Sequence, residues 1–238
     1  AVPRQAATRA PSPALPFGTD SPSSQKLGVL LLSQGAPDSA VDLESFLFNV
    51  YEDPEVVTIP KAARWAARPL AWAIAKTSAR GIKRETDGLL DAVSISESQQ
   101  LKIVRSQGER LEARLRETGV RAQIFVAMRY WRPYISEAVE AIKASGVTHL
   151  VILPLFPQFS VSTSGSGLRV LEDMLDADPE FAQIRNTVIP SWYRQSAYLE
   201  ALAAKIARAC GDAEAQGVPA RAQVGAKDVV REEAPAAV

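Results

Sequence analysis

Four short apolar runs, separated by helix-like segments, constrain the fold of this chain more than any other feature of its sequence. The first run, residues 27–32, is continuously apolar, which is typical of a strand buried on both faces. Similar runs cover residues 123–127, 150–155 and 187–189. Strands that alternate with helices need crossover connections, so the pattern predicts a doubly wound α/β domain with a parallel sheet of about four strands.

The segments between these runs repeat apolar residues at helical spacing. Asp38 or Ser39 is expected to cap a helix that continues through residues 43–50. Pro60 is expected to open a second helical stretch, and residues 96–118 predict a long amphipathic helix. Further helices are expected over residues 133–144, 167–175 and 193–209.

Both ends of the chain differ in composition from the regular part. Residues 1–25 are rich in Ala, Pro and Ser, contain Arg4 and Arg9, and have one acid, Asp20. This composition cannot bury a core, and it fits either a disordered tail or an organelle transit peptide. Residues 211–238 show no convincing strand. The expected organisation is a tail over 1–25, one α/β lobe over 26–210 and a disordered tail over 211–238.

Composition excludes several classes of function. Lys+Arg and Asp+Glu are both 27, so the basic excess of a nucleic-acid binder is absent. Cys210 is the only cysteine and His149 the only histidine, which excludes an internal disulfide, a Cys-cluster zinc site and a cluster held by several cysteines of one chain. The most apolar helix candidate, residues 65–75, is too short to span a bilayer.

The unusual residues of the sequence follow the ends of the predicted strands, where open α/β sheets bind ligands. The loop after residue 127 contains Arg129, Tyr130 and Arg132, and a Ser/Thr-rich run occupies residues 160–166. Aromatic rings, arginines and hydroxyls together suit a flat apolar ligand with anionic substituents. Taken singly, each is equally explained as a surface charge, a core aromatic or a flexible loop.

The wording of these loops resembles the ferrochelatase family, and most of all its plant, algal and cyanobacterial branch. The family typically reads LLLNLGGPD, FLYNLFxDP, MRYWHPF and VVLPLYPQFSxSTSGSSLR in this order. The chain reads LLLSQGAPD over 30–38, FLFNVYEDP over 46–54, MRYWRPY over 128–134, VILPLFPQFSVSTSGSGLR over 151–169 and TVIPSWY over 187–193.

The resemblance implies a lyase that inserts Fe²⁺ into protoporphyrin IX to form protohaem, with iron as substrate and no bound prosthetic group. It implies a plastid location, with the mitochondrion less favoured. Val161 stands where animal members have a cluster-ligating cysteine, so no iron–sulfur cluster is expected. Arg129 and Tyr130 are placed beside the metal and the porphyrin. The other residues placed along the porphyrin are Gln34, Phe156, Ser160, Ser162 and Thr163, with Ser98 as a weaker candidate.

The chain also departs from the family pattern. Residues 95–99 replace a GGGSP segment, and Arg132 replaces a histidine. The FSAHG-type segment with the family's histidine, and a later acidic residue, have no counterpart, so no catalytic group is identified and the metal ligands are unknown. His149 begins a predicted strand, roughly 20 Å from the loop at its other end, and cannot replace that base. Only the first of two similar lobes is expected.

Two hypotheses remain open on the sequence. One is a ferrochelatase that is shortened here or gains its second lobe elsewhere; the other is a non-catalytic tetrapyrrole-binding half-protein, or an incomplete gene model. A chelatase for another tetrapyrrole fits the loops less well. The absent lobe predicts an exposed apolar flank and therefore self-association. The helix over residues 65–74 predicts peripheral contact with a membrane.

Overall fold

The computed structural model describes residues 25–85 and 98–215 of the chain. The predictions for residues 1–24, 95–97 and 216–238 lie outside this part. The chain forms two compact units that divide between Ser191 and Trp192, and each is described by itself. In chain order, the elements are β1 (Leu27–Ser33), α1 (Leu43–Glu52), η1 (Lys61–Ala66), α2 (Ala67–Glu85), α4 (Gln99–Glu117), β2 (Ala122–Met128), α5 (Ile135–Ser145), β3 (His149–Pro154), η2 (Val161–Gly165), α6 (Ser166–Ala177), α7 (Pro179–Ala182), β4 (Arg185–Val188) and α8 (Ser196–Ala215).

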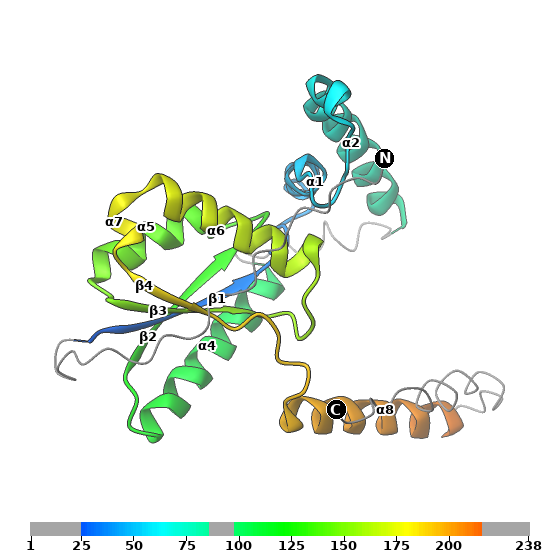
Figure 1. Ribbon diagram of the computed structural model, residues 1–238. Coiled ribbons are helices and arrows are strands. Elements are labelled where there is room, and N and C mark those ends of the chain that lie inside the picture. The colour runs from blue at the N-terminus through cyan, green and yellow to red at the C-terminus, as the bar shows by residue number, and fades with distance from the viewer. Residues whose placement is uncertain (1–24, 86–97, 216–238) are drawn as a thin grey trace, which may run out of the picture. The chain divides into compact units, whose positions relative to one another are not determined.

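The four strands form one parallel sheet in the order β2-β1-β3-β4, which confirms the predicted fold class. β1 is central: Val29 lies opposite Ile124 of β2 on one side and Val151 of β3 on the other. β4 covers residues 185–188, slightly earlier than the predicted 187–189. Because all strands run the same way, their carboxyl ends gather at one edge of the sheet, the edge nearest α1 (Figure 1).

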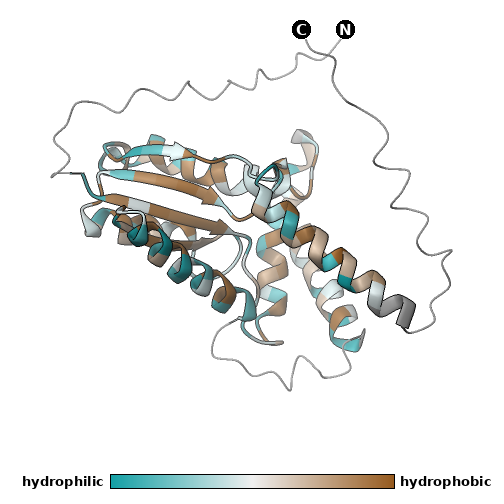
Figure 2. Cartoon of the chain, turned by 90° about the horizontal axis from the view of Figure 1, so that it is seen from below, coloured by the Kyte–Doolittle hydropathy of each residue, from teal (hydrophilic) through white to brown (hydrophobic). Residues whose placement is uncertain are grey.

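The sheet is buried on both faces of β1. Leu30 and Leu32 pack into the layer formed by α5, α6 and α7, whereas Val29 and Leu31 pack towards α4. Side chains alternate between the faces of a strand, so a continuous apolar run is what a strand between two helical layers requires. In Figure 2 the strands of the buried part of the sheet are largely brown, the colour of hydrophobic residues.

The start of α1 corrects one prediction. The helix begins at Leu43 with Asp42 at its N-cap, not at Asp38 or Ser39. Ser39 donates its hydroxyl hydrogen bond to Asp42 (2.6 Å). Asp38 instead accepts from the Ser98 backbone N–H (2.7 Å) and from the Trp131 indole N–H (2.9 Å). Asp38, although its side chain is well suited to cap a helix, therefore bonds to residues that are distant in the sequence.

The starts of α2 and α4 agree better with the sequence. Pro60 precedes the 3₁₀ turn that leads into α2, and α2 packs on α1 through a small apolar cluster that includes Leu47 and Ala75. Ser98 caps α4, since its hydroxyl accepts a hydrogen bond from the Leu101 N–H (3.2 Å). Among the described residues, none of the helices has both the length and the apolarity needed to cross a membrane.

The second unit contains α8 among its described residues. This helix continues to Ala215, so the boundary expected at residue 210 falls inside it. The ring of Trp192 meets that of Tyr198 edge-on, with centroids 5.2 Å apart, at the start of the helix. Leu199, Leu202 and Ile206 recur at helical spacing and are all exposed.

Leu30 provides a test of the two-layer core. Its side chain is fully buried, so Leu30→Ala should leave a cavity and lower the free energy of unfolding by about 2–5 kcal/mol. Leu70→Ala removes the same atoms from an exposed position and is the matched control, with an expected loss below about 1 kcal/mol. Urea denaturation followed by circular dichroism measures both. Equal losses for the two variants would contradict the core assignment.

Candidate functional site

The loops after β1 and β2 are tied together at the carboxyl edge of the sheet. The backbone N–H of Arg129 donates to Ser33 O (2.8 Å), and that of Tyr130 donates to Gln34 O (2.9 Å). Gly35 adopts a left-handed φ of 89°, and a Cβ there would lie 3.0 Å from the Cβ of Trp131. Glycine is thus required both by the turn and by the close approach of the second loop.

A pocket of about 270 Å³ opens where these loops meet α1. It brings together Gln34, Tyr130 and Ser162, three of the seven residues that the resemblance assigns to porphyrin binding, from loops after three different strands. The opposite wall is apolar and comes from α1 and the segment after it. An apolar wall facing an amide and hydroxyls suits a mainly apolar ligand with a few polar contacts. The apolar wall consists of Phe46, Leu47, Val50 and Val56.

A buried carboxylate, Asp53, lies behind this pocket. Its Oδ2 accepts hydrogen bonds from Arg129 Nη2 (2.9 Å) and Tyr130 Oη (2.8 Å), and a short one from Ser166 Oγ. Its Oδ1 accepts from the Glu55 backbone N–H (2.8 Å). The side chain of Asp53 is 1% exposed and that of Arg129 is 23% exposed, so the ion pair is largely shielded from water.

This network sets the protonation states of its members. Burial alone would raise the pKa of Asp53, but the hydrogen bonds from Ser166, Glu55 and Tyr130 and the charge of Arg129 outweigh it and hold that pKa below its usual value. Burial, and then the neighbouring Asp53 carboxylate, raise the pKa of Tyr130 to about 12. Tyr130 therefore remains protonated near neutral pH and cannot serve as a base there.

Both arginines of the loop after β2 are engaged by acidic side chains. Arg129 pairs with Asp53, donates its Nε–H to Ser166 Oγ (2.7 Å) and stacks over the Tyr130 ring at 4.9 Å. Arg132 contacts Glu137 at 3.3 Å on the surface. The sequence suggested that these arginines pair with ligand carboxylates, whereas each already has a protein partner in the structure. Their positive charges are therefore largely balanced within the lobe.

The Ser/Thr-rich run forms a single turn of π-helix, η2, before α6. Ser160 Oγ and Thr163 Oγ1 lie 2.6 Å apart, so these two hydroxyls bond to each other. π-Turns occur often at functional sites. The hydroxyl of Ser164 is buried without a hydrogen-bond partner among the described residues. Phe156, before this turn, is half-buried and does not line the pocket.

Two sequence predictions, for Ser98 and for His149, concern residues away from this pocket. Ser98 is buried, and its hydroxyl caps α4, which is a structural role. Its contact with the porphyrin remains a prediction. His149 begins β3 opposite Leu27, at the start of β1, whereas Arg129 follows the end of β2. Six residues of strand at about 3.3 Å each separate His149 from the site edge. No cluster of metal-ligating side chains occurs within the described ranges.

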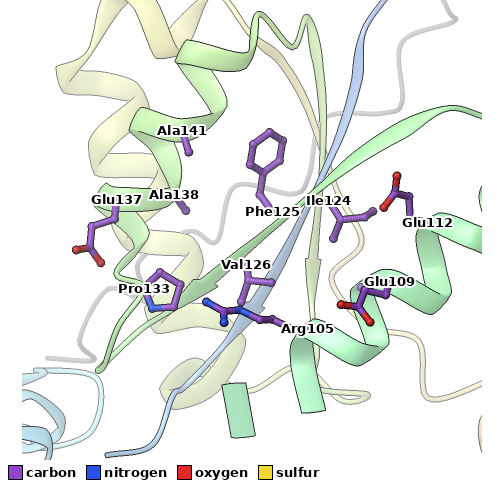
Figure 3. A pocket seen from close by; sticks show the side chains of 11 residues that line it. Arg105, Glu109, Glu112, Ile124, Phe125, Val126, Pro133, Glu137, Ala138 and Ala141 are labelled. Atoms are coloured by element: carbon purple, nitrogen blue, oxygen red, sulfur yellow. The ribbon is translucent and has the colours of Figure 1, made fainter. Parts of the chain in front are cut away.

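A second pocket, of about 410 Å³, lies at the outer edge of β2 between α4 and α5 (Figure 3). Its floor is Ile124, Phe125 and Val126, and Glu109 and Glu112 of α4 line one side. It contains none of the residues that the sequence assigned to a ligand. The pocket at the carboxyl edge of the sheet is therefore the candidate site.

Comparison with known proteins agrees with the loops described above. The family model described as Ferrochelatase matches residues 26–224. The chain belongs to the ferrochelatase family. It is similar to the ferrochelatases of a Cyanothece species (45% identity over 178 residues), Nostoc punctiforme (44% over 187) and Synechococcus elongatus (41% over 183). These alignments cover 75–77% of this chain and 44–46% of the relatives, so the chain spans less than half their length.

Sequence reasoning gave no role to the apolar wall of this candidate site, nor to its buried carboxylate. Asp53 was quoted within the FLFNVYEDP motif but was given no role, because nothing near it in the sequence indicates a partner. Arg129 follows 76 residues later and Ser166 113 residues later. The available signal was an acidic residue directly before Pro54, at the end of an apolar helical pattern.

Tyr130→Phe tests the network through pH. The pKa of Tyr130 rises from 10.0 to about 12 on folding, so the stability that it contributes is complete below pH 10 and is lost as pH rises towards 12. At pH 8 the variant should unfold about 1–3 kcal/mol more easily than the parent chain. This difference should shrink between pH 10 and pH 12. Urea unfolding at stepped pH measures it, with the exposed Tyr193→Phe as control; a difference that does not vary with pH would contradict the assignment.

Proposed function

We propose that this chain takes part in the insertion of Fe²⁺ into protoporphyrin IX to form protohaem, and that it supplies one wall of the porphyrin cleft. The proposal is carried by the pocket in which Gln34, Tyr130 and Ser162 face the apolar wall of α1. Membership of the ferrochelatase family supports a porphyrin as the ligand of that pocket. Iron is a substrate in this reaction. No iron–sulfur cluster is proposed, because Cys210 is the only cysteine.

Metal insertion requires the removal of two pyrrole protons and of the water bound to the ferrous ion. The Arg129 guanidinium donates to Asp53 and Ser166 and offers no acceptor for a proton, and the raised pKa of Tyr130 keeps the hydroxyl proton of that residue in place. His149, the only histidine of the sequence, lies at the opposite edge of the sheet. The described residues around the pocket thus bind and orient the macrocycle, and the base comes from elsewhere. Binding of a tetrapyrrole without catalysis is the second candidate function, favoured by this same distribution.

Catalysis is tested by comparing the 238-residue chain with a fusion that adds the remaining part of the Nostoc punctiforme ferrochelatase. Given Fe²⁺ and protoporphyrin without oxygen, the chain alone should metallate near the uncatalysed rate, because a general base contributes about 10²- to 10⁴-fold. The fusion should be faster by at least that factor. Loss of porphyrin fluorescence measures both rates. Equal rates would show that the base lies within this lobe.

Binding is tested by titrating the same chain into protoporphyrin and following the change in fluorescence. Gln34→Ala and Ser162→Ala should each weaken binding about fivefold, because each removes one polar contact with the ligand. Gln183→Ala, an exposed position at the end of α7, is the matched control and should bind as the parent chain does. Unchanged affinity in both pocket variants would reject this pocket as the porphyrin site.

We also propose that α2 and the turn before it rest on a membrane surface. Trp65 is 84% exposed and Trp72 is 51% exposed. Every charged residue between positions 61 and 84 is Lys or Arg, and the Trp72 ring lies 4.6 Å from Lys76 Nζ. Exposed tryptophans with cations are typical of helices that lie in the interface of anionic bilayers. A plastid membrane is the proposed location, supported by the cyanobacterial relatives and by the transit-like composition of residues 1–25.

Vesicle sedimentation checks this surface. The chain should sediment with vesicles containing anionic phospholipid and not with purely zwitterionic ones, and the double variant Trp65→Ser/Trp72→Ser should remain in the supernatant. Val41→Ser, at another exposed apolar position, should bind as the parent does. We also propose self-association, for which the exposed Leu199, Leu202 and Ile206 of α8 offer an apolar surface, and light scattering without lipid measures it separately. Equal sedimentation of all three proteins would reject the membrane surface.

A further inference from the structure

Asp53 lies where the parts of the lobe that build the pocket come together. It follows α1, and it contacts both the loop after β2 and the first residue of α6. We propose that Asp53 is a positioning residue that holds Arg129, Tyr130 and the Ser160–Thr163 turn in the arrangement needed for porphyrin binding. The identity of the ligand in this inference rests on the proposed function, whereas the contacts of Asp53 come from the structure alone.

The link from Asp53 to the pocket runs through residues that it touches. Tyr130 lines the pocket and gives its hydroxyl hydrogen to Asp53. Ser166 begins α6 directly after the π-turn that presents Ser162, and it also donates to Asp53. On the third side, the Asp53 N–H donates to Val50 O, and Val50 lines the pocket from α1. Asp53 itself is not among the lining residues, so it acts through its neighbours.

The arrangement requires a carboxylate and not simply a polar group. One oxygen, Oδ2, accepts from three donors, and Oδ1 accepts from the Glu55 N–H. In asparagine, an amide nitrogen at the Oδ2 position would face three donors, and one at the Oδ1 position would face the Glu55 N–H. Either orientation leaves buried donors unsatisfied, and both leave Arg129 without its negative partner.

The first experiment measures the geometry without any ligand. In the full chain, the Nε–H of Arg129 is bonded to Ser166 Oγ, so its NMR signal, identified by its loss in Arg129→Lys, should exchange slowly with water. Asp53→Asn should make this exchange at least tenfold faster, while exposed Asp173→Asn should not change it. Unchanged exchange in Asp53→Asn overturns the inference, whether or not the chain binds porphyrin.

The second experiment measures the coupling to the pocket. Asp53→Asn should weaken protoporphyrin binding about tenfold or more. Adding Ser162→Ala to Asp53→Asn should cost little further affinity, because Ser162 is no longer held in place. Fully additive losses would mean that Asp53 acts only on general stability, and would overturn the inference. If Asp53→Asn does not fold, Asp53→Glu, which keeps the negative charge but moves both carboxylate oxygens, replaces it in both experiments and is judged by the same outcomes.

The two experiments distinguish a wrong ligand assignment from a wrong positioning role. If the parent chain binds no porphyrin while Arg129 exchange still depends on Asp53, then the ligand assignment is wrong and the positioning role stands. If porphyrin binds well and Asp53→Asn changes neither exchange nor affinity, then the positioning role is wrong and the ligand assignment stands.

Discussion

β1 pairs with β2 on one side and with β3 on the other, and this double pairing decides where the site can form. The register is in phase, so Ser33 and Met128 end their strands together. The loops that follow must then leave the sheet at the same edge, where backbone hydrogen bonds join Arg129 to Ser33 and Tyr130 to Gln34. Helices on both faces bury the pairing and make it insensitive to changes at the surface.

The site also depends on how the buried charges at that edge are paired. A carboxylate as buried as Asp53 is stable in its charged form only with donors and an opposite charge around it, and it has both. The same arrangement uses the charge of Arg129, so the pocket beside it is close to electrically neutral. A macrocycle with a large apolar face suits such a surface better than a small anion does. For this reason we propose that the pocket forms a binding wall and not a reactive centre.

The proposed wall of a porphyrin cleft lies in a chain that spans less than half the length of the ferrochelatase relatives that it matches. The aromatic and basic surface of η1 and α2 belongs to the same lobe, since α2 packs on α1 and α1 lines the pocket.

The sequence by itself determined the elements and their class. The continuous apolar run over 27–32 and the helical spacing that follows it are local patterns, which can be recognised in the sequence without a structure. The loop motifs identified the family. They also indicated that Gln34, Tyr130 and Ser162 lie at one edge of the sheet, because parallel strands end at a common edge. Local cues were less reliable at helix boundaries: Asp38 has the chemistry of a cap but is engaged by Ser98 and Trp131, far from it in the chain.

Only the tertiary structure decided the partners of the charged residues. Asp53 meets Arg129 and Ser166 across 76 and 113 residues, and no periodicity links positions so far apart. Whether an arginine binds a ligand or an internal carboxylate depends on which side chains the packed helices bring within 3 Å of it. That outcome is a property of the whole fold. The packing of α1, β2 and α6 brings the two charged side chains together, and their burial determines how strongly they interact.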